Sequence, residues 1–264
     1  MEPQADALRH GAYICLSATA ATRPALAGAA VPSLAAGLGF ENEYNTAAGH
    51  PPDAIAFLRR VNATTPDLED DALLHAEAIV HVASASAPRV REFCDQLLLL
   101  MGDAAMTRIL GGVVQPTRYT SQAMHEFAYA HQLAQQPARG MPNAFLLPMR
   151  KTPAWWAKDW MERHTYFLPR YDDAGRMTHQ GHALAASLGI HSLMRRTYKH
   201  PEPPAPGNSY EFINYFECAD AGVATFYEVC AALRDRRKNP EWDFVLEGPT
   251  WQGRRVERWP ELFA

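Results

Sequence analysis

The order of strand-like and helix-like segments is the feature that most limits what this chain can fold into. From residue 76 onward, runs that alternate like strands are separated by segments with apolar residues at helical spacing. In the second half the predicted elements are a strand at 144–150, helices at 154–168 and 178–190, strands at 191–200 and 210–219, a helix at 223–237, and a strand at 244–256 with a turn at Gly248-Pro249. Strand, helix, strand, strand, helix, strand is the order of a ferredoxin-like unit.

The first half approximates the same order. Its predicted elements are a strand at 12–20, a helix at 51–61, a strand from 76, a helix at 88–102, and strands at 108–121 and 125–133. The helix at 51–61 is expected because its prolines suit a first helical turn. We therefore predict an α+β fold in which two ferredoxin-like repeats, residues 1–140 and 141–264, form a dimeric α+β barrel domain. The halves share no residue-level repeat, and the sequence assigns no role to residues 1–75.

Composition narrows the class of protein. With 47% hydrophobic and 20% charged residues, the chain can bury a sizeable core. A net charge of −4 argues against nucleic-acid binding, which needs a basic excess. No apolar run of about 18 residues predicts a membrane span. The N-terminus is acidic and polar, unlike a secretory signal, and no cysteine pair has CxxC spacing, so we expect reduced, mostly buried thiols in a cytoplasmic protein.

His182 is the first candidate for chemistry. It follows Gly181 and precedes the small residues "ALAAS", so a bulky group can approach this predicted helix. A buried core histidine is the ordinary explanation. Arg195 and Arg196 favour a site, because adjacent strand residues point to opposite faces and one of the two is expected to point inward. An inward arginine near an axial histidine would be a fixed positive charge beside a bound metal.

A cluster of tryptophans precedes this histidine. Trp155, Trp156 and Trp160 are explained well enough as large hydrophobic residues on a helix that faces the core. Arg150 and Lys151, just before them, either bind carboxylates or form a solvated strand end. The tryptophans alone therefore do not indicate a cofactor.

Four segments together resemble the chlorite dismutase family of heme proteins. They are "KTPAWW" at 151–156 with Glu162 and Arg163 after it, "RRTYKH" at 195–200, "YEFINYFECAD" at 210–220, and "EGPTWQG" at 247–253. The resemblance covers roughly residues 76–258 and is stronger in the second half. No single motif is diagnostic, but their order and spacing are similar to those of the family.

The resemblance implies a heme b site. His182 would be the iron ligand, because the 13 residues from it to Arg195 match the family's spacing from histidine to distal residue. An ungapped alignment of "RRTYKH" instead favours Arg196 as the distal residue, so both arginines stay candidates. The resemblance also implies further residues around the heme, namely Lys151 and Trp155 near a propionate and the proximal side, and Asn214 and Phe216 on the distal side.

Two departures from the family pattern matter. An insertion separates Arg163 from His182 where the family runs one helix, so His164 and His179 are rival ligands. In the coproheme decarboxylases of the family a tyrosine precedes a Pro-Met segment, whereas "LLPMRK" places Leu147 at that position. The missing tyrosine argues against decarboxylase chemistry.

The expected function is a heme-dependent oxidoreductase acting on a small oxyanion, a peroxide or another small molecule. Coproheme decarboxylation is one alternative. A cofactor-free α+β barrel that binds a small molecule is another, in which His182 is a core residue and the arginines pair with Glu211 or Glu217. We also expect a homo-oligomer, because partners usually cover the edges and apolar faces of this fold.

Overall fold

A closed barrel of antiparallel strands forms the centre of the molecule. The computed structural model describes residues 9–46, 51–65, 72–102, 105–114, 133–200 and 210–264. A ten-stranded sheet closes on itself where β10 pairs with β6, which leaves β2 and β11 outside an eight-stranded ring. The ring consists of β1 (Arg9–Leu16), β3 (Ala54–Thr64), β4 (Ala78–Ser84), β5 (Met106–Val114), β6 (Asn143–Lys151), β9 (Met194–Lys199), β10 (Phe212–Cys218) and β12 (Thr250–Val256).

Both halves of the ring have the ferredoxin-like strand order. The first half runs β5-β1-β4-β3 and the second runs β9-β10-β6-β12, so in each the first strand of the half lies between the third and the fourth. The halves join at the β5–β9 and β3–β12 seams. The predicted α+β fold, two ferredoxin-like repeats that form one barrel, is therefore confirmed.

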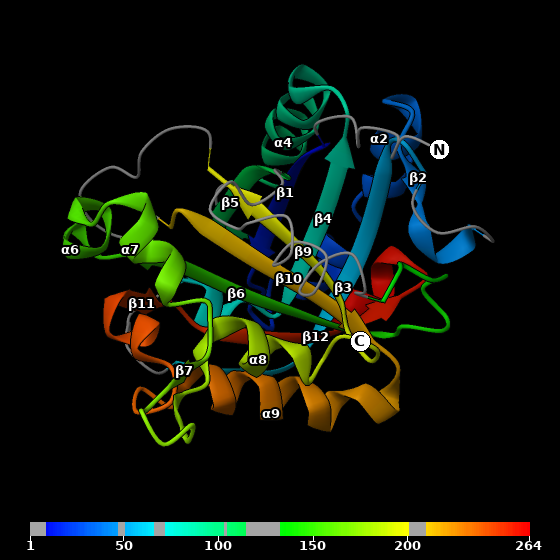
Figure 1. Cartoon of the computed structure of the whole chain (residues 1–264). Coiled ribbons are helices and arrows are strands. Elements are labelled where there is room, and N and C mark those ends of the chain that lie inside the picture. Colours follow the sequence, from blue (N-terminus) through cyan, green and yellow to red (C-terminus); the bar gives the residue numbers. More distant parts are fainter. Residues whose placement is uncertain (1–8, 47–50, 66–71, 103–104, 115–132, 201–209) are drawn as a thin grey trace, which may run out of the picture.

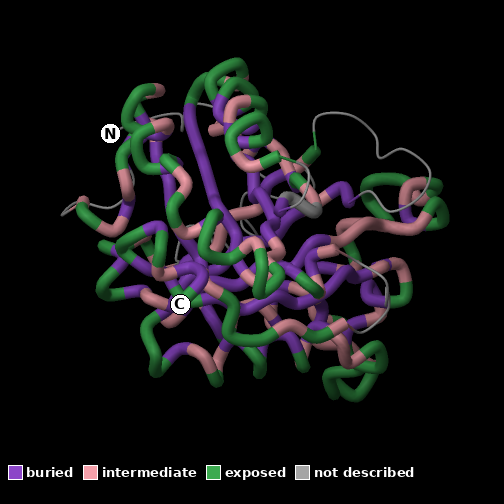
Figure 2. Tube along the Cα trace, turned by 180° about the vertical axis from the view of Figure 1, so that it is seen from behind, coloured by how far each residue is buried: buried purple, intermediate pink, exposed green. Residues whose placement is uncertain are grey.

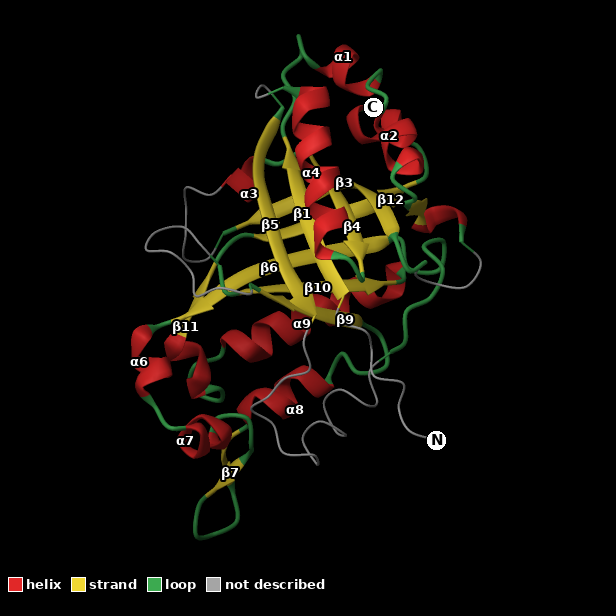
Figure 3. Cartoon of the chain, turned by 90° about the horizontal axis from the view of Figure 1, so that it is seen from above, coloured by secondary structure: helices red, strands yellow, loops and turns green. Residues whose placement is uncertain are grey.

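Helices cover the outer face of each half (Figures 1 and 3). On the first half lie α1 (Arg23–Ala27), α2 (Val31–Gly37), α4 (Ala87–Met101) and the C-terminal 3-10 helix η5 (Trp259–Phe263). On the second half lie α8 (Gly181–Ser187) and α9 (Val223–Arg234). The remaining elements are β2 (Glu41–Asn42), η1 (Glu43–Asn45), α3 (Ala72–His75), α6 (Pro153–Ala157), α7 (Trp160–Thr165), β7 (Arg170–Tyr171), β8 (Met177–His179), η3 (Asp220–Gly222), η4 (Pro240–Phe244) and β11 (Val245–Glu247).

The helix predicted at 51–61 is wrong, because the segment forms strand β3 from Ala54 onward. Its residues 54–58 are all buried, and β3 pairs with β4 on one side and with β12 on the other. A short, fully buried apolar run has no diagnostic period, so pairing on two edges decides its conformation.

Two other predicted segments are divided. The helix expected at 154–168 is two short helices, α6 and α7, and Asp159 starts the second by accepting from the Glu162 backbone N–H at 2.8 Å. The last strand breaks at Gly248-Pro249 into β11 and β12, where a turn was expected. The strand predicted at 125–133 lies almost entirely outside the described residues.

Close backbone approach closes the barrel at the β5–β9 seam. A Cβ atom on Gly112 would lie 2.9 Å from the Lys199 carbonyl oxygen and 3.0 Å from the Tyr198 Cβ. Gly11 on β1 faces the ring of Tyr198 in the same way. Gly112 therefore marks a close approach between strands β5 and β9.

The core has one layer inside the barrel and one under the helices of each half. In Figure 2 the buried residues lie mostly along the strands. All four cysteines are buried and free. Trp259 of η5 donates through Nε1 to the Leu26 carbonyl at 2.7 Å, so the end of the chain packs on the first half.

The division of the chain into repeats 1–140 and 141–264 stays a prediction. Among the described helices, none is long and apolar enough to cross a membrane.

Candidate functional site

The candidate site is an apolar pocket between the sheet of the second half and helices α8 and α9. The space inside and at the mouth of the pocket, open solvent included, is about 1090 Å³. Alternate residues of three strands form its floor, because successive strand residues face opposite sides of a sheet. These are Leu147, Met149 and Lys151 of β6, Arg195 and Thr197 of β9, and Phe212, Asn214 and Phe216 of β10.

His182 lines this pocket from the first turn of α8. The turn that presents it depends on Gly181, which has φ +73° and whose Cβ position would lie 2.5 Å from the Leu168 carbonyl oxygen. A side chain at residue 181 is therefore excluded by both backbone conformation and space. Phe167 packs beside the imidazole, with ring centroids 5.2 Å apart.

A buried carboxylate holds His182 and Lys151 together. Glu241 of η4 binds the imidazole Nδ1 through Oε2 at 2.7 Å and the Lys151 ammonium through Oε1. The exposed fractions of the side chains are 13% for His182, 9% for Lys151 and 3% for Glu241. Burial opposes ionisation of Glu241, but the positive charge of Lys151 and the contact with His182 outweigh it and lower its pKa to about 2.

Sequence reasoning missed Glu241. It lies 59 residues from His182 and 90 from Lys151, and no local pattern marks it. The only local signal is its place after Pro240 at the start of a short helix. The fold alone brings the three side chains together.

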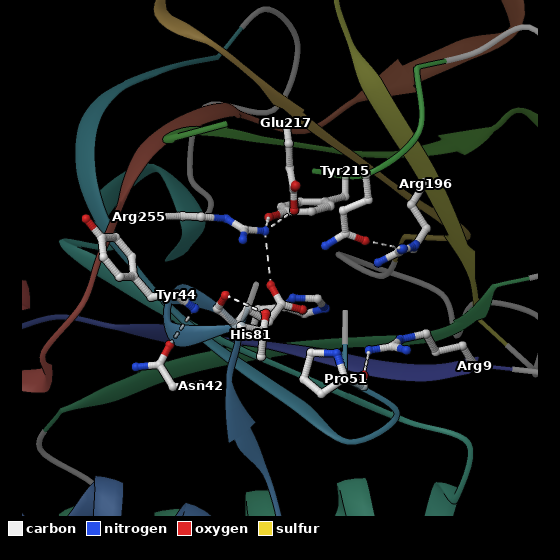
Figure 4. Close-up of polar contacts among 12 residues, drawn as sticks. Arg9, Asn42, Tyr44, Pro51, His81, Arg196, Tyr215, Glu217 and Arg255 are labelled. Atoms are coloured by element: carbon white, nitrogen blue, oxygen red, sulfur yellow. Dashed lines mark hydrogen bonds and ion pairs between the residues drawn. The ribbon is translucent and has the colours of Figure 1, made fainter. Parts of the chain in front are cut away.

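The two candidate arginines lie on opposite faces of β9. Arg195 lines the pocket that contains His182. The side chain of Arg196 lies inside the barrel (Figure 4) and donates to Gln135 Oε1 at 2.9 Å. Only Arg195 shares the pocket with the histidine.

Three further residues were predicted around the heme. Asn214 and Phe216 line the pocket, and Trp155 lies behind it. Asn214 accepts from the Thr197 hydroxyl at 2.9 Å and donates to the Leu147 carbonyl at 3.4 Å, next to Phe216 on the pocket floor. Trp155 is not part of the lining; it is buried, and the Lys151 ammonium lies 4.3 Å from its ring centroid.

The adjacent tryptophan and the rival histidines lie elsewhere. Trp156 donates to Glu211 Oε2 at 3.2 Å, and Trp160 is 63% exposed on α7. Neither His164 on α7 nor His179 on β8 lines the pocket. The insertion between Arg163 and His182 forms the β7–β8 hairpin, after which the chain returns to the pocket at Gly181.

Similar proteins were found by comparing structures. No protein-family model and no curated protein matches the sequence. The structure is similar to chlorite dismutase from Candidatus Nitrospira defluvii in complex with imidazole, with a TM-score of 0.66 and 17% identity over 97% of this chain and 93% of that one. A mutant of that enzyme in complex with cyanide gives a TM-score of 0.65 and 16% identity over 97% and 93%. The putative chlorite dismutase TA0507 gives 0.59 and 13% over 97% and 98%.

Proposed function

From a chain with a chlorite dismutase-like fold, we propose a heme-dependent oxidoreductase that acts on a small oxyanion, a peroxide or another small molecule. The observation that carries the proposal is the bond from Glu241 to Nδ1 of His182, which leaves Nε2 as the ring nitrogen for a metal in an apolar pocket. Neutral imidazole bound in this way is a common iron ligand in heme proteins.

The residues present fit heme b. The described lining of the pocket is mostly apolar, as a flat porphyrin requires, and His182 is the one histidine among those lining residues. Lys151 and Arg195 line it as cations, while Trp155 supports Lys151 from behind. When bound, heme would supply the iron chemistry that breaks an O–O or Cl–O bond.

Glu241 and Lys151 act on the proximal histidine. The carboxylate accepts a hydrogen bond from Nδ1–H, which fixes the tautomer and the ring orientation and raises the basicity of Nε2. Lys151 keeps the carboxylate ionised in a buried place where it would otherwise hold a proton. We propose that the triad of Lys151, Glu241 and His182 sets the electron density at a bound iron.

Arg195 acts on the substrate. Its guanidinium is a permanent positive charge on the pocket floor, suited to hold a small anion or to stabilise negative charge on oxygen as a bond breaks. Asn214 and Thr197 are polar residues on the same pocket floor, and they are hydrogen-bonded to each other. Arg196 has no place in this role because it faces the barrel interior.

Two competing functions are less well supported. Leu147 lines the pocket at the position where coproheme decarboxylases carry a tyrosine, and its side chain has no hydroxyl group to take part in that reaction. In a cofactor-free barrel the arginines would pair with Glu211 or Glu217; the charge of Glu217 does act on Arg196, but Arg195 lines the pocket of His182. We also propose a homo-oligomer in the cytoplasm.

An absorption titration with hemin tests the proposal. We expect saturable binding at one heme per chain, weakened or spectrally altered in His182→Ala. His164→Ala and His179→Ala are matched controls outside the pocket and should titrate like the wild type. If His182→Ala has no effect while either control does, the ligand assignment is wrong, and absence of specific binding rejects the heme proposal. Incubation with coproheme and peroxide should give no decarboxylated product.

A further inference from the structure

The short helix that carries Glu241 cannot fix its own position. Helix η4 has five residues in 3-10 conformation, a helix type with poor hydrogen-bond geometry that is used in short pieces. A helix this short is not stable alone, so contacts with the rest of the fold must hold it. Glu241 reaches both His182 and Lys151 only while η4 keeps one position. The direction of its carboxylate therefore depends on what holds η4.

The start of η4 is tied to the turn before the histidine. The Lys238 carbonyl, just before η4, accepts from the backbone N–H of Gln180 at 2.7 Å and from that of Gly181 at 3.3 Å. Next to it, Asn239 is fully buried and donates through Nδ2 to the Leu233 carbonyl of α9 at 2.9 Å. These bonds fix where η4 begins relative to α8 and α9.

Trp242 holds the middle of η4. It follows Glu241 directly in sequence and donates through Nε1 to Glu247 Oε2 at 3.2 Å. Its indole lines the pocket, with its ring centroid 6.4 Å from that of His182. An indole has a single N–H donor, so this bond gives the ring one preferred orientation. The acceptor on Glu247 thus limits how η4 can turn.

Glu247 is itself held by two elements. Its two carboxylate oxygens accept from Nε and Nη2 of Arg234, at 2.9 and 3.1 Å, which is a bidentate pair of charge-assisted bonds. It belongs to β11 and pairs in register with Met149 of β6, the strand that also carries Lys151. Glu247 is buried and is not one of the described residues that line the pocket. It therefore links η4 to the strand of the triad lysine from outside the pocket.

We propose that Glu247 is a positioning residue of the heme site, which directs the Glu241 carboxylate to His182 through its bond with Trp242. The inference rests on the proposed function for the identity of the group that His182 binds. Without this bond η4 can turn, and the Lys151 ammonium on its flexible stem can follow the carboxylate. The imidazole cannot follow, because it packs against Phe167. The bond from Nδ1–H of His182 should therefore weaken first.

The first test needs no heme. In the full chain with isotope-labelled histidine, the Nδ1–H proton of His182 should give an NMR signal that is protected from exchange and is absent in His182→Ala. Trp242→Phe keeps a ring in the pocket wall but removes the donor to Glu247. It should speed exchange of this proton about tenfold, the size expected for losing one charge-assisted hydrogen bond. Trp259→Phe removes a comparable indole bond in the first half and should leave exchange unchanged.

Glu247→Gln is the second variant, and it leaves every described lining residue of the pocket in place. An amide offers one acceptor oxygen, which the charged guanidinium of Arg234 should take at the expense of Trp242. Exchange of the His182 proton should again be faster. Unchanged exchange in either variant, equal acceleration by Trp259→Phe, or a wild type without a protected Nδ1–H proton overturns the inference.

The heme-loaded protein gives a separate spectroscopic readout. In the ferrous protein, the iron–histidine stretching band of the resonance Raman spectrum should shift to lower frequency in Trp242→Phe and Glu247→Gln. A weaker acceptor on Nδ1 makes Nε2 less basic. A chain that binds no hemin would reject the proposed function and leave the exchange result standing. A chain that binds hemin with an unshifted band in both variants contradicts the inference.

Discussion

Arg195 and Arg196 are neighbours in sequence, yet one lines the pocket of His182 and the other lies inside the barrel. Strand β9 therefore presents these two arginines on opposite faces. Arg195 pairs in register with Phe216, which faces the pocket, and Arg196 with Tyr215, which faces the interior. Each face of the strand serves a different cluster, so variants of the two arginines should have separable effects.

Substitution of Arg195 should change small-anion binding in the heme-loaded protein, if the proposed function holds. Arg195→Gln is expected to weaken azide binding about tenfold, because it removes a guanidinium from the pocket floor. Arg196→Gln, the matched control, should change azide affinity by less than about threefold. Optical titration of the ferric protein measures both. Equal losses in the two variants would refute the assignment of Arg195.

Loss of the Glu241 carboxylate should destabilise the fold. Glu241→Gln leaves the buried ammonium of Lys151 without its counter-charge, and we expect the free energy of unfolding to fall by about 3 kcal/mol. Glu162→Gln removes the partner of Lys158 in an exposed pair and should cost less than about 1 kcal/mol. Urea unfolding of the three proteins gives the comparison. Similar costs for both variants would show that the buried triad contributes no special stability.

The same carboxylate predicts a pH dependence. Its pKa falls from an ordinary value of 4.5 to about 2 in the folded protein, so its contribution is complete above pH 4.5 and is lost as the pH falls toward 2. The difference in unfolding free energy between wild type and Glu241→Gln should be constant at higher pH. Below pH 4.5 it should shrink by about 1.4 kcal/mol per pH unit. A difference that is as large at pH 3 as at pH 6 would contradict the low pKa.

The β5–β9 seam should not tolerate a side chain at Gly112. Gly112→Ala places a methyl group against the Lys199 backbone and should cost about 1–3 kcal/mol, because the strands must separate. Gly37→Ala in α2 meets nothing within 4 Å and should be neutral or stabilising by up to about 1 kcal/mol. Thermal unfolding distinguishes the two, and equal melting temperatures would mean that the seam can relax around the methyl group.

The prediction for residues 51–61 failed for a reason that applies widely. Proline at a first turn and apolar residues at mixed spacing fit a helix as well as a buried strand. Residues 54–58 are buried throughout, so they carry no alternation that could reveal a strand. Pairing with β4 and β12 decides the matter, and those partners are distant in sequence.

The sequence by itself predicted the α+β class and the order of strands and helices in the second half, because strand and helix periods are local properties. It also named His182 and Arg195 as candidates 13 residues apart, beside the rivals His164, His179 and Arg196. Only the tertiary structure decided which arginine faces the pocket, because the faces of a strand depend on its register with its neighbours. Only the fold supplied Glu241 to His182 and Lys151, and Glu43 to Arg255. Charge pairing between distant residues leaves no periodic trace in a sequence; it follows from burial, which makes an unpaired charge too costly to keep.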